Sequence, residues 1–126
     1  MNGKIVFDTN IIIHFWGSEP DTPNLRALML QYDCLISVIT RIELLSYWKI
    51  TEAELNQINL FLDELTVIPL TDEVVQKTIE FRRCVNRKSP DSIIAATAIL
   101  MGATFLTQDP HLLKSEFPGL IVSDTL

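Results

Sequence analysis

Short apolar runs alternate along the chain with longer segments in which apolar residues recur every three or four positions. The runs cover residues 4–7, 34–36, 67–68, 104–106 and 120–122 and have the length of short strands. The longer segments have the apolar spacing of amphipathic helices. Because alternating strands and helices are typical of a parallel sheet covered on both faces, we predict an α/β fold with a central sheet of about five short strands flanked by helices.

Residues that begin and end helices bound the helical segments. Thr9 or Asn10 can cap the first helix, and Thr51 and Glu54 have the spacing of a capping box. Gly102 suits the left-handed backbone that ends many helices. The predicted helices contain residues 11–15, 23–31, 37–48, 51–65, 72–87 and 89–101, and residues 17–23 are predicted to form a turn-rich loop.

Length and composition fit one domain. With 126 residues, 48% of them apolar, the chain can build one hydrophobic core, so we predict a single domain over residues 1–126. The most apolar stretch, residues 93–106, contains Thr97, Gly102 and Thr104 and is shorter than the ~20 residues of a membrane helix. Only Lys4 is basic before Asp8 interrupts the first apolar run, which does not fit a signal peptide. We therefore expect a cytoplasmic protein without membrane contact.

Four carboxylates lie at or just beyond junctions where a predicted strand gives way to a helix, or inside the first turns of such a helix. They are Asp8, Glu43, Asp91 and Asp109. Because residues at the carboxyl ends of parallel strands converge on one crevice, carboxylates scattered along the chain can meet there. Four buried like charges require cations to stay ionised. The pattern predicts a divalent-metal site, with metal-assisted phosphodiester hydrolysis as the leading hypothesis.

Three of these carboxylates also have a structural explanation when each is considered alone. Asp8 can be a helix cap. Ser89 and Pro90 fit a cap and a first-turn proline, which places Asp91 in a first turn, where a negative charge is favourable without a catalytic role. Asp109 stands directly before a proline and therefore also fits a simple turn.

Glu43 borders the apolar face of its predicted helix, next to Ile42. We therefore expect its side chain to be partly buried and to need a partner. An ion pair with Arg41 or Arg26 is the structural alternative to metal binding.

Cysteine spacing and net charge bear on whether the chain binds zinc or nucleic acid. Cys34 and Cys84 lie 50 positions apart, without a CxxC pattern or paired histidines, which excludes the usual zinc spacings and predicts two reduced thiols. The formal net charge of −6 weighs against nucleic-acid binding by a simple basic patch. Two divalent ions would cancel the charge of the four carboxylates, and this weakens the objection.

In sequence order, four blocks around the carboxylates resemble a PIN domain of the VapC toxin type. The blocks are residues 5–10 (IVFDTN), 36–45 (ISVITRIELL), 89–98 (SPDSIIAATA) and 105–109 (FLTQD). The resemblance extends over essentially the whole chain, whose length suits a stand-alone toxin. It implies a ribonuclease that uses Mg²⁺ or Mn²⁺ and that is paired with an antitoxin encoded beside it.

The resemblance also implies roles for individual residues. The implied catalytic and metal-binding quartet is Asp8, Glu43, Asp91 and Asp109. Thr107 and Asn10 become supporting polar groups, and Lys88 matches a basic residue common in such toxins. After Asp109 many relatives have an aromatic residue where this chain has Pro110, so we expect the local helix to be shifted.

The ligand set favours a particular mechanism. Oxygen ligands select hard cations, so Mg²⁺, with Mn²⁺ as a substitute, is preferred over zinc. In a two-metal site the attacking water is acidified by one ion and the leaving oxygen is stabilised by the other. We predict hydrolysis that leaves a 5′-phosphate and a 3′-hydroxyl. Asp8 and Asp91 are expected to contact the ions, and Glu43 and Asp109 to bind them directly or through water.

A dense basic cluster directly precedes Asp91 and consists of Arg82, Arg83, Arg87 and Lys88. It can form a phosphate-binding rim for RNA, because such contacts position RNA without reading its sequence. It can equally be a solvated helix end that the helix dipole favours.

Aromatic and apolar surfaces predict protein partners. We interpret the aromatic residues at two helix ends, Phe15, Trp16, Tyr47 and Trp48, as interface groups. Wide apolar stripes on residues 23–31 and 51–65 suit an antitoxin or a second subunit, so a homodimer is expected. His14 and His111 are expected to be structural or exposed.

Two other classes of function compete with a nuclease. A phosphoryl-transfer or receiver-type domain also places aspartates at strand ends, but it would have a second acidic residue where this chain has Asn10. A catalytically inert PIN-like module that only binds a protein partner is the alternative from a different class, and the intact quartet argues against it.

Overall fold

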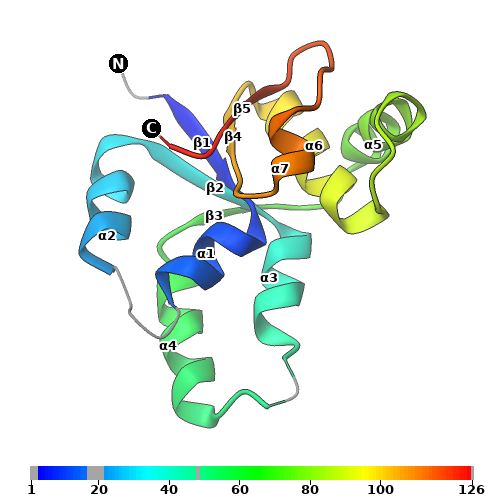
Figure 1. Cartoon of the computed structure of the whole chain (residues 1–126). Helices are drawn as coiled ribbons and strands as arrows, with labels where there is room; N and C mark the ends of the chain where they lie inside the picture. Colours follow the sequence, from blue (N-terminus) through cyan, green and yellow to red (C-terminus); the bar gives the residue numbers. More distant parts are fainter. Residues whose placement is uncertain (1–2, 17–21, 48, 126) are drawn as a thin grey trace.

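One parallel sheet of five strands, in the order β3-β2-β1-β4-β5, runs through the centre of the chain. The computed structural model describes residues 3–16, 22–47 and 49–125 (Figure 1). The strands are β1 (Lys4–Phe7), β2 (Asp33–Ser37), β3 (Thr66–Ile68), β4 (Thr104–Leu106) and β5 (Ile121–Ser123). All four pairings are parallel, so the predicted α/β fold with a five-stranded sheet is confirmed.

Seven helices of the described residues connect and flank the strands. They are α1 (Thr9–Phe15), α2 (Thr22–Gln31), α3 (Val38–Leu45), α4 (Glu52–Leu62), α5 (Asp72–Cys84), α6 (Ser89–Met101) and α7 (Pro110–Leu113). The predicted capping box is confirmed, because the backbone N–H of Glu54 donates to the Thr51 hydroxyl while that of Thr51 donates to the Glu54 carboxylate, each at 3.2 Å.

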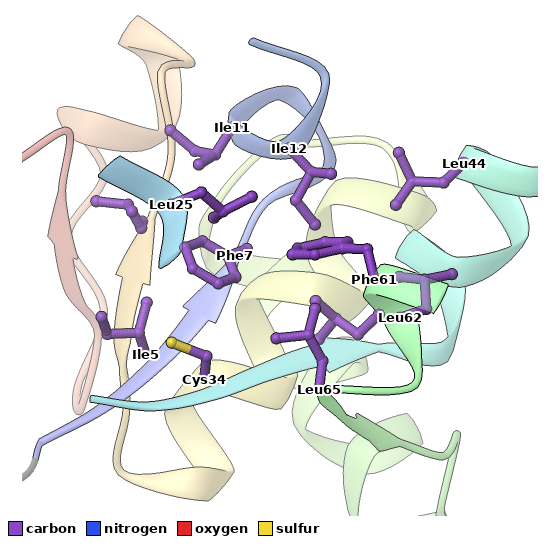
Figure 2. Close-up of a cluster of buried hydrophobic side chains, with 12 residues drawn as sticks. Ile5, Phe7, Ile11, Ile12, Leu25, Cys34, Leu44, Phe61, Leu62 and Leu65 are labelled. Carbon is purple, nitrogen blue, oxygen red and sulfur yellow. The ribbon is translucent and has the colours of Figure 1, made fainter. Parts of the chain in front are cut away.

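Alternate side chains of the strands enter two separate hydrophobic cores, as the two-residue period of a strand requires. Ile5 and Phe7 of β1 belong to one core, and Val6 belongs to the other. Side chains of α1, α2 and α4 complete the first core (Figure 2). Side chains of α5, α6 and α7 complete the second. Both faces of the sheet are therefore covered, and polar residues that follow the strands lie at the sheet's edge.

Several predicted helix ends are wrong. Asp8, rather than Thr9 or Asn10, caps α1, because its carboxylate accepts a hydrogen bond from the backbone N–H of Thr9. Lys88 rather than Ser89 occupies the cap position of α6. The helices predicted to extend to residues 48 and 65 end at residues 45 and 62.

The end of α5 has a consequence for the basic cluster. The helix ends at Cys84 instead of near residue 87, because the buried Val85 adopts an extended backbone. Arg87 and Lys88 therefore lie between α5 and α6, outside either helix. The local helix expected after Asp109 is the short α7, which begins at Pro110. Residues 17–21 of the predicted loop and Trp48 lie outside the described residues, and Pro23 belongs to α2.

The described helices and cysteines can be compared with the expectations of no membrane contact and of two reduced thiols. None of these helices is both long and apolar enough to cross a membrane. Cys34 and Cys84 are free thiols, as predicted; the first is buried and the second is exposed. Burial, with a smaller contribution from the Asp33 carboxylate, raises the pKa of Cys34 to about 11 and keeps its thiol protonated near neutral pH.

Gly102 ends α6 with the predicted left-handed backbone, at φ 62° and ψ 32°. A Cβ atom at this position would meet no atom within 4 Å, so a larger residue would be opposed by its own backbone alone. We expect Gly102→Ala to lower the free energy of unfolding by about 1–2 kcal/mol, measured by urea denaturation. Gly102→Asn should lose less, because asparagine tolerates this backbone better. Equal losses in the two variants would contradict this explanation.

Candidate active site

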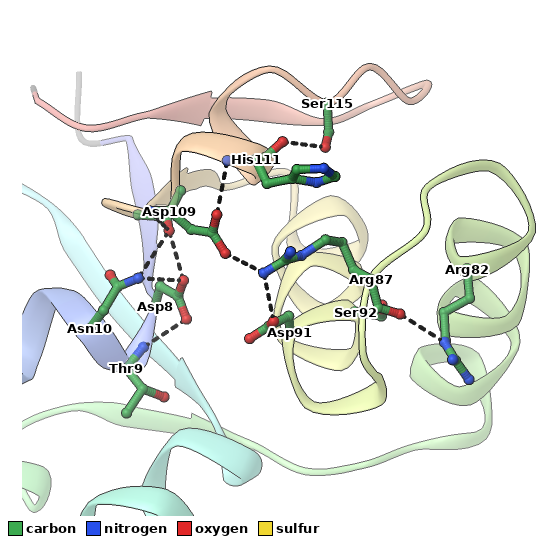
Figure 3. Close-up of polar contacts among 11 residues, drawn as sticks. Asp8, Thr9, Asn10, Arg82, Arg87, Asp91, Ser92, Asp109, His111 and Ser115 are labelled. Carbon is green, nitrogen blue, oxygen red and sulfur yellow. Dashed lines mark hydrogen bonds and ion pairs between the residues drawn. The ribbon is translucent and has the colours of Figure 1, made fainter.

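The segments that follow the strands bring the predicted carboxylates to one edge of the sheet. Because β1 lies between β2 and β4, the segments that leave the carboxyl ends of these strands are neighbours. Asp8 follows β1, Thr107 and Asp109 follow β4, and Glu43 lies on α3 after β2. Asp91 lies in the first turn of α6. Figure 3 shows Asp8, Asp91 and Asp109 grouped at this edge.

Asp8 is the most buried of the four carboxylates, with 4% of its surface exposed. Its Oδ1 accepts a hydrogen bond from the backbone N–H of Thr9 at 2.9 Å. Its Oδ2 accepts from the Thr107 hydroxyl at 2.7 Å and from the Asn10 side-chain amide at 3.2 Å. These donors hold the carboxylate in one orientation and partly offset its lost hydration. Asn10 and Thr107, the two predicted supporting groups, thus both contact Asp8.

The Thr107 hydroxyl links the ends of β1 and β4. A hydroxyl has one proton, here donated to Asp8, and two lone pairs. The lone pairs accept from the backbone N–H of Asp109 at 3.0 Å and from the Asn10 amide at 3.4 Å. Thr107 is 0% exposed, so water does not compete for these contacts. The orientation of Asp8 is therefore tied to the backbone position of Asp109.

The surroundings of Asp8 oppose its negative charge. Burial raises the pKa of Asp8 to about 6, and the charges of Asp91 and Glu43 add smaller contributions in the same direction. The hydrogen bonds from Thr107 and Thr9 act in the opposite direction and do not restore the ordinary value of 3.8. At neutral pH an ionised Asp8 is therefore unfavourably placed unless a positive charge lies beside it.

Glu43 lies at the same edge, but its environment differs from the prediction. Glu43 is exposed on α3, although we expected its side chain to be partly buried. The Thr9 hydroxyl donates a 2.6 Å hydrogen bond to Glu43 and lies 3.1 Å from the hydroxyl of Thr40. No ion pair joins Glu43 to Arg41 or Arg26 within the described ranges, and Arg26 pairs with Glu64 instead.

Arg87 pairs with two of the candidate metal ligands, a contact that was not predicted. Its Nη2 donates to Oδ2 of Asp91 at 3.0 Å and also to Oδ2 of Asp109 (Figure 3). Asp109 also caps α7, because its Oδ1 accepts from the backbone N–H of His111 at 2.9 Å. Arg87 and Asp91 are four positions apart, which was the available signal even though Arg87 lies outside the helix. No sequence pattern indicated the contact between Arg87 and Asp109.

The chemistry of the donors at this edge fits a hard divalent cation. All four candidate ligands are carboxylates, and the buried Asp8 has two of the other carboxylates near enough to raise its pKa. Within the described part of the chain, however, no group of three or more His, Cys, Asp or Glu side chains is arranged to hold a metal ion. The positive charge placed between Asp91 and Asp109 is the Arg87 guanidinium.

The four residues of the basic cluster differ in their surroundings. Arg83 and Lys88 are exposed, whereas Arg87 faces the carboxylates. The Arg82 Nε donates to the backbone carbonyl of Arg87 at 3.1 Å. An RNA-binding role for the cluster stays a prediction, and Arg82, Arg83 and Lys88 are its exposed members.

An apolar groove beside Glu43 is a second feature of this region. It lies between α1, α3 and α4, and its lining includes Ile13, Trp16, Tyr47 and Glu54. Trp16 stacks edge-on against Phe61, with ring centroids 4.5 Å apart. Trp16 and Tyr47 both line this groove, and their interface role stays a prediction. His14 and His111 are exposed, as expected.

Comparison with known proteins identifies the family of this fold. The PIN domain family model matches residues 5–117. No curated protein sequence matches the chain.

Solved structures of similar fold come from toxin–antitoxin complexes. A chain of VapBC2 from Rickettsia felis, bound to a DNA fragment from its promoter, is 25% identical, with a TM-score of 0.80 over 95% of this chain and 97% of that one. A chain of a toxin–antitoxin complex from Klebsiella pneumoniae is 25% identical, with a TM-score of 0.73 over 93% and 95%. A chain of DNA-bound VapBC from Salmonella typhimurium shares the fold at 22% identity, with a TM-score of 0.79 over 96% and 97%.

The raised pKa of Asp8 predicts how stability depends on pH when metal is removed with EDTA. Between the unfolded value of 3.8 and the folded value of about 6, the folded state binds more protons, so stability falls as pH rises through this interval. We expect the wild type to lose roughly 3 kcal/mol relative to Asp8→Asn between about pH 4 and pH 7. Urea denaturation at stepped pH measures this difference.

A matched surface variant serves as the control. Asp63→Asn alters an exposed aspartate at the end of α4 and should follow the wild-type pH profile. Parallel profiles for the wild type and Asp8→Asn would show that Asp8 does not titrate at a raised pKa.

Proposed function

The chain belongs to the PIN domain family, and from this premise we propose that it is a metal-dependent endoribonuclease and the toxin of a toxin–antitoxin pair. The observation that carries the nuclease proposal is the buried Asp8 carboxylate, whose pKa is raised by burial and by the neighbouring carboxylates Asp91 and Glu43. Such a group favours a divalent cation as its partner. The similarity to a chain of VapBC2 and to a chain of a toxin–antitoxin complex supports the toxin role.

In the proposed mechanism the carboxylates hold Mg²⁺, or Mn²⁺ as a substitute. Asp8 and Asp91 would contact the metal, and Glu43 and Asp109 would hold it directly or through water. The bound metal would acidify the attacking water and stabilise the leaving oxygen, leaving a 5′-phosphate and a 3′-hydroxyl. Thr107 and Asn10 orient Asp8 through their hydrogen bonds, and Thr9 orients Glu43. These side chains therefore preorganise the ligands before any RNA arrives.

The protein partner is proposed to bind the groove between α1, α3 and α4. This groove combines an apolar lining with two acidic residues, Glu43 and Glu54. An antitoxin segment with apolar and basic side chains complements that lining. We call the edge of the sheet at which Asp8, Glu43, Asp91 and Asp109 lie the acidic edge. Because Glu43 belongs both to the groove and to this edge, a segment bound in the groove would lie next to the candidate active site. A cytoplasmic location and a homodimer are also part of the proposal.

Cleavage of RNA tests the nuclease proposal. Purified protein, free of any partner, should cut total cellular RNA at discrete sites with Mg²⁺ or Mn²⁺ and not with EDTA. Asp8→Asn should reduce cleavage by on the order of a hundredfold or more, because it removes one charged ligand. Asp63→Asn, an exposed aspartate outside the acidic edge, should cut as the wild type does. Mapping of the new ends checks for 5′-phosphates.

Two results would contradict this mechanism. Intact RNA after incubation with folded, partner-free protein would favour the inert PIN-like binding module. Full cleavage by Asp8→Asn would remove Asp8 from the active site.

Binding of the partner tests the groove. We expect Ile13→Asp to weaken binding of the polypeptide encoded beside this chain by at least about tenfold, because it places a charge in an apolar contact. Ile13 is 57% exposed, so the fold should tolerate the change. Ile121→Asp is the matched control, since Ile121 is 60% exposed on β5 and lies outside the groove. Calorimetric affinities that fall equally in both variants, or in neither, would place the partner elsewhere.

A further inference from the structure

Arg87 is the cation that the described residues provide for the candidate metal ligands. One nitrogen, Nη2, donates to Asp91 Oδ2 and to Asp109 Oδ2. No other Lys or Arg in the described ranges forms an ion pair with Asp8, Glu43, Asp91 or Asp109. The guanidinium therefore supplies charge compensation that a divalent ion would otherwise supply to the same oxygen atoms.

We propose that Arg87 is an internal counter-cation of the acidic edge, which a divalent ion must displace from Asp91 and Asp109 before these carboxylates can bind it. The proposal rests on the metal-dependent function proposed above and assigns to that site a residue that controls its metal occupancy. Arg87 is a positioning residue in this role, because it acts through the two carboxylates.

The pairing is suited to displacement because it leaves Arg87 incompletely satisfied. The Arg87 Nε is buried and has no hydrogen-bond partner. A buried donor without a partner loses its hydration without compensation, so this position carries a free-energy cost. The side chains of Arg87, Asp91 and Asp109 are also 23%, 31% and 20% exposed, so water and small ions reach them.

The backbone at Arg87 is held independently of the ion pairs. Its N–H donates to the carbonyl of Val85 at 2.9 Å. Its carbonyl accepts from the Arg82 Nε at 3.1 Å and from the Ser92 hydroxyl at 3.3 Å. Exchange of guanidinium for metal therefore requires rotation of one long side chain and no rearrangement of α5 or α6. Figure 3 shows this anchored backbone beside α6, with the side chain extended towards the carboxylates.

Competition between Arg87 and a metal ion for the same carboxylates has a thermodynamic consequence. A ligand's apparent affinity is lowered by the fraction of protein that is not competent to bind it. While Arg87 occupies Asp91 and Asp109, this fraction is large and metal binding is weakened. The same contacts stabilise the metal-free fold, because they neutralise carboxylates that would otherwise repel one another. Removal of the guanidinium should therefore have opposite effects on metal affinity and on metal-free stability.

Metal affinity and melting temperature of the full chain, stripped with EDTA and free of partner, test the proposal. Mn²⁺ should bind Arg87→Gln on the order of tenfold more tightly than the wild type by isothermal titration calorimetry. The metal-free melting temperature of Arg87→Gln should fall, and Mn²⁺ should raise it by more than it raises that of the wild type. Arg87→Lys should show intermediate Mn²⁺ affinity, because lysine keeps the positive charge but as a flexible, strongly hydrated point charge. Arg83→Gln, an exposed arginine of α5, is the control and should match the wild type.

Failure of this inference can be told apart from failure of the proposed function. Equal or weaker Mn²⁺ binding by Arg87→Gln, with normal binding by the wild type, would overturn the role of Arg87 and leave the metal site intact. Absence of Mn²⁺ binding in the wild type and in every variant would overturn both. A purely structural role for Arg87 would lower stability without tightening metal binding, and it is excluded by the expected result.

A second measurement is made on the wild type and needs a variant only to assign one resonance. The Arg87 Nε–H resonance, assigned by its loss in the spectrum of Arg87→Lys, reports the environment of this side chain. Titration with diamagnetic Mg²⁺ should shift this resonance and speed its exchange with water, while the Arg83 resonance stays unchanged. An Arg87 resonance that does not respond at Mg²⁺ concentrations that saturate the site would overturn the proposal.

Discussion

Burial of the Asp8 carboxylate at the end of the central strand is the constraint on which the rest of the site depends. β1 is the middle strand of the sheet, so the residue that follows it is surrounded by the segments after β2 and β4. Burial there opposes the charge of Asp8, and nearby carboxylates oppose it further. The carboxylates gathered at this edge are compensated in two ways, by hydrogen bonding and by positive charge.

The two responses act on different carboxylates. Asp8 has three hydrogen-bond donors and, among the described residues, no ion pair. Asp91 and Asp109 share the Arg87 guanidinium. The Thr107 hydroxyl couples the two groups, because it contacts both Asp8 and the backbone of Asp109. The position of the Asp109 backbone and the orientation of Asp8 are therefore tied to one buried side chain. This coupling links the proposed metal chemistry to the proposed exchange at Arg87.

Local sequence signals predicted the elements well where one residue determines the backbone. Gly102 adopts the left-handed end that its lack of a Cβ permits, and Thr51 and Glu54 form the capping box that their spacing indicated. The same signals failed where packing decided. Thr9 and Asn10 are good caps, yet Asp8 caps α1, and their side chains instead contact Glu43 and Asp8. α5 ends early because Val85 is buried in the second core, together with side chains of α5, α6 and α7.

The sequence by itself determined the succession of strands and helices along the chain, the parallel sheet and the junctions at which the carboxylates lie. These features depend on periodicity and on short-range backbone preferences. The sequence did not determine which charges meet. Arg87 and Asp109 are 22 positions apart and Asp8 and Thr107 are 99 positions apart, and each pair is brought together by the strand order β2-β1-β4 and the docking of α6 against it. Only the tertiary structure decided these contacts, because a contact between distant residues depends on where the sheet places their backbones and not on the residues that flank them.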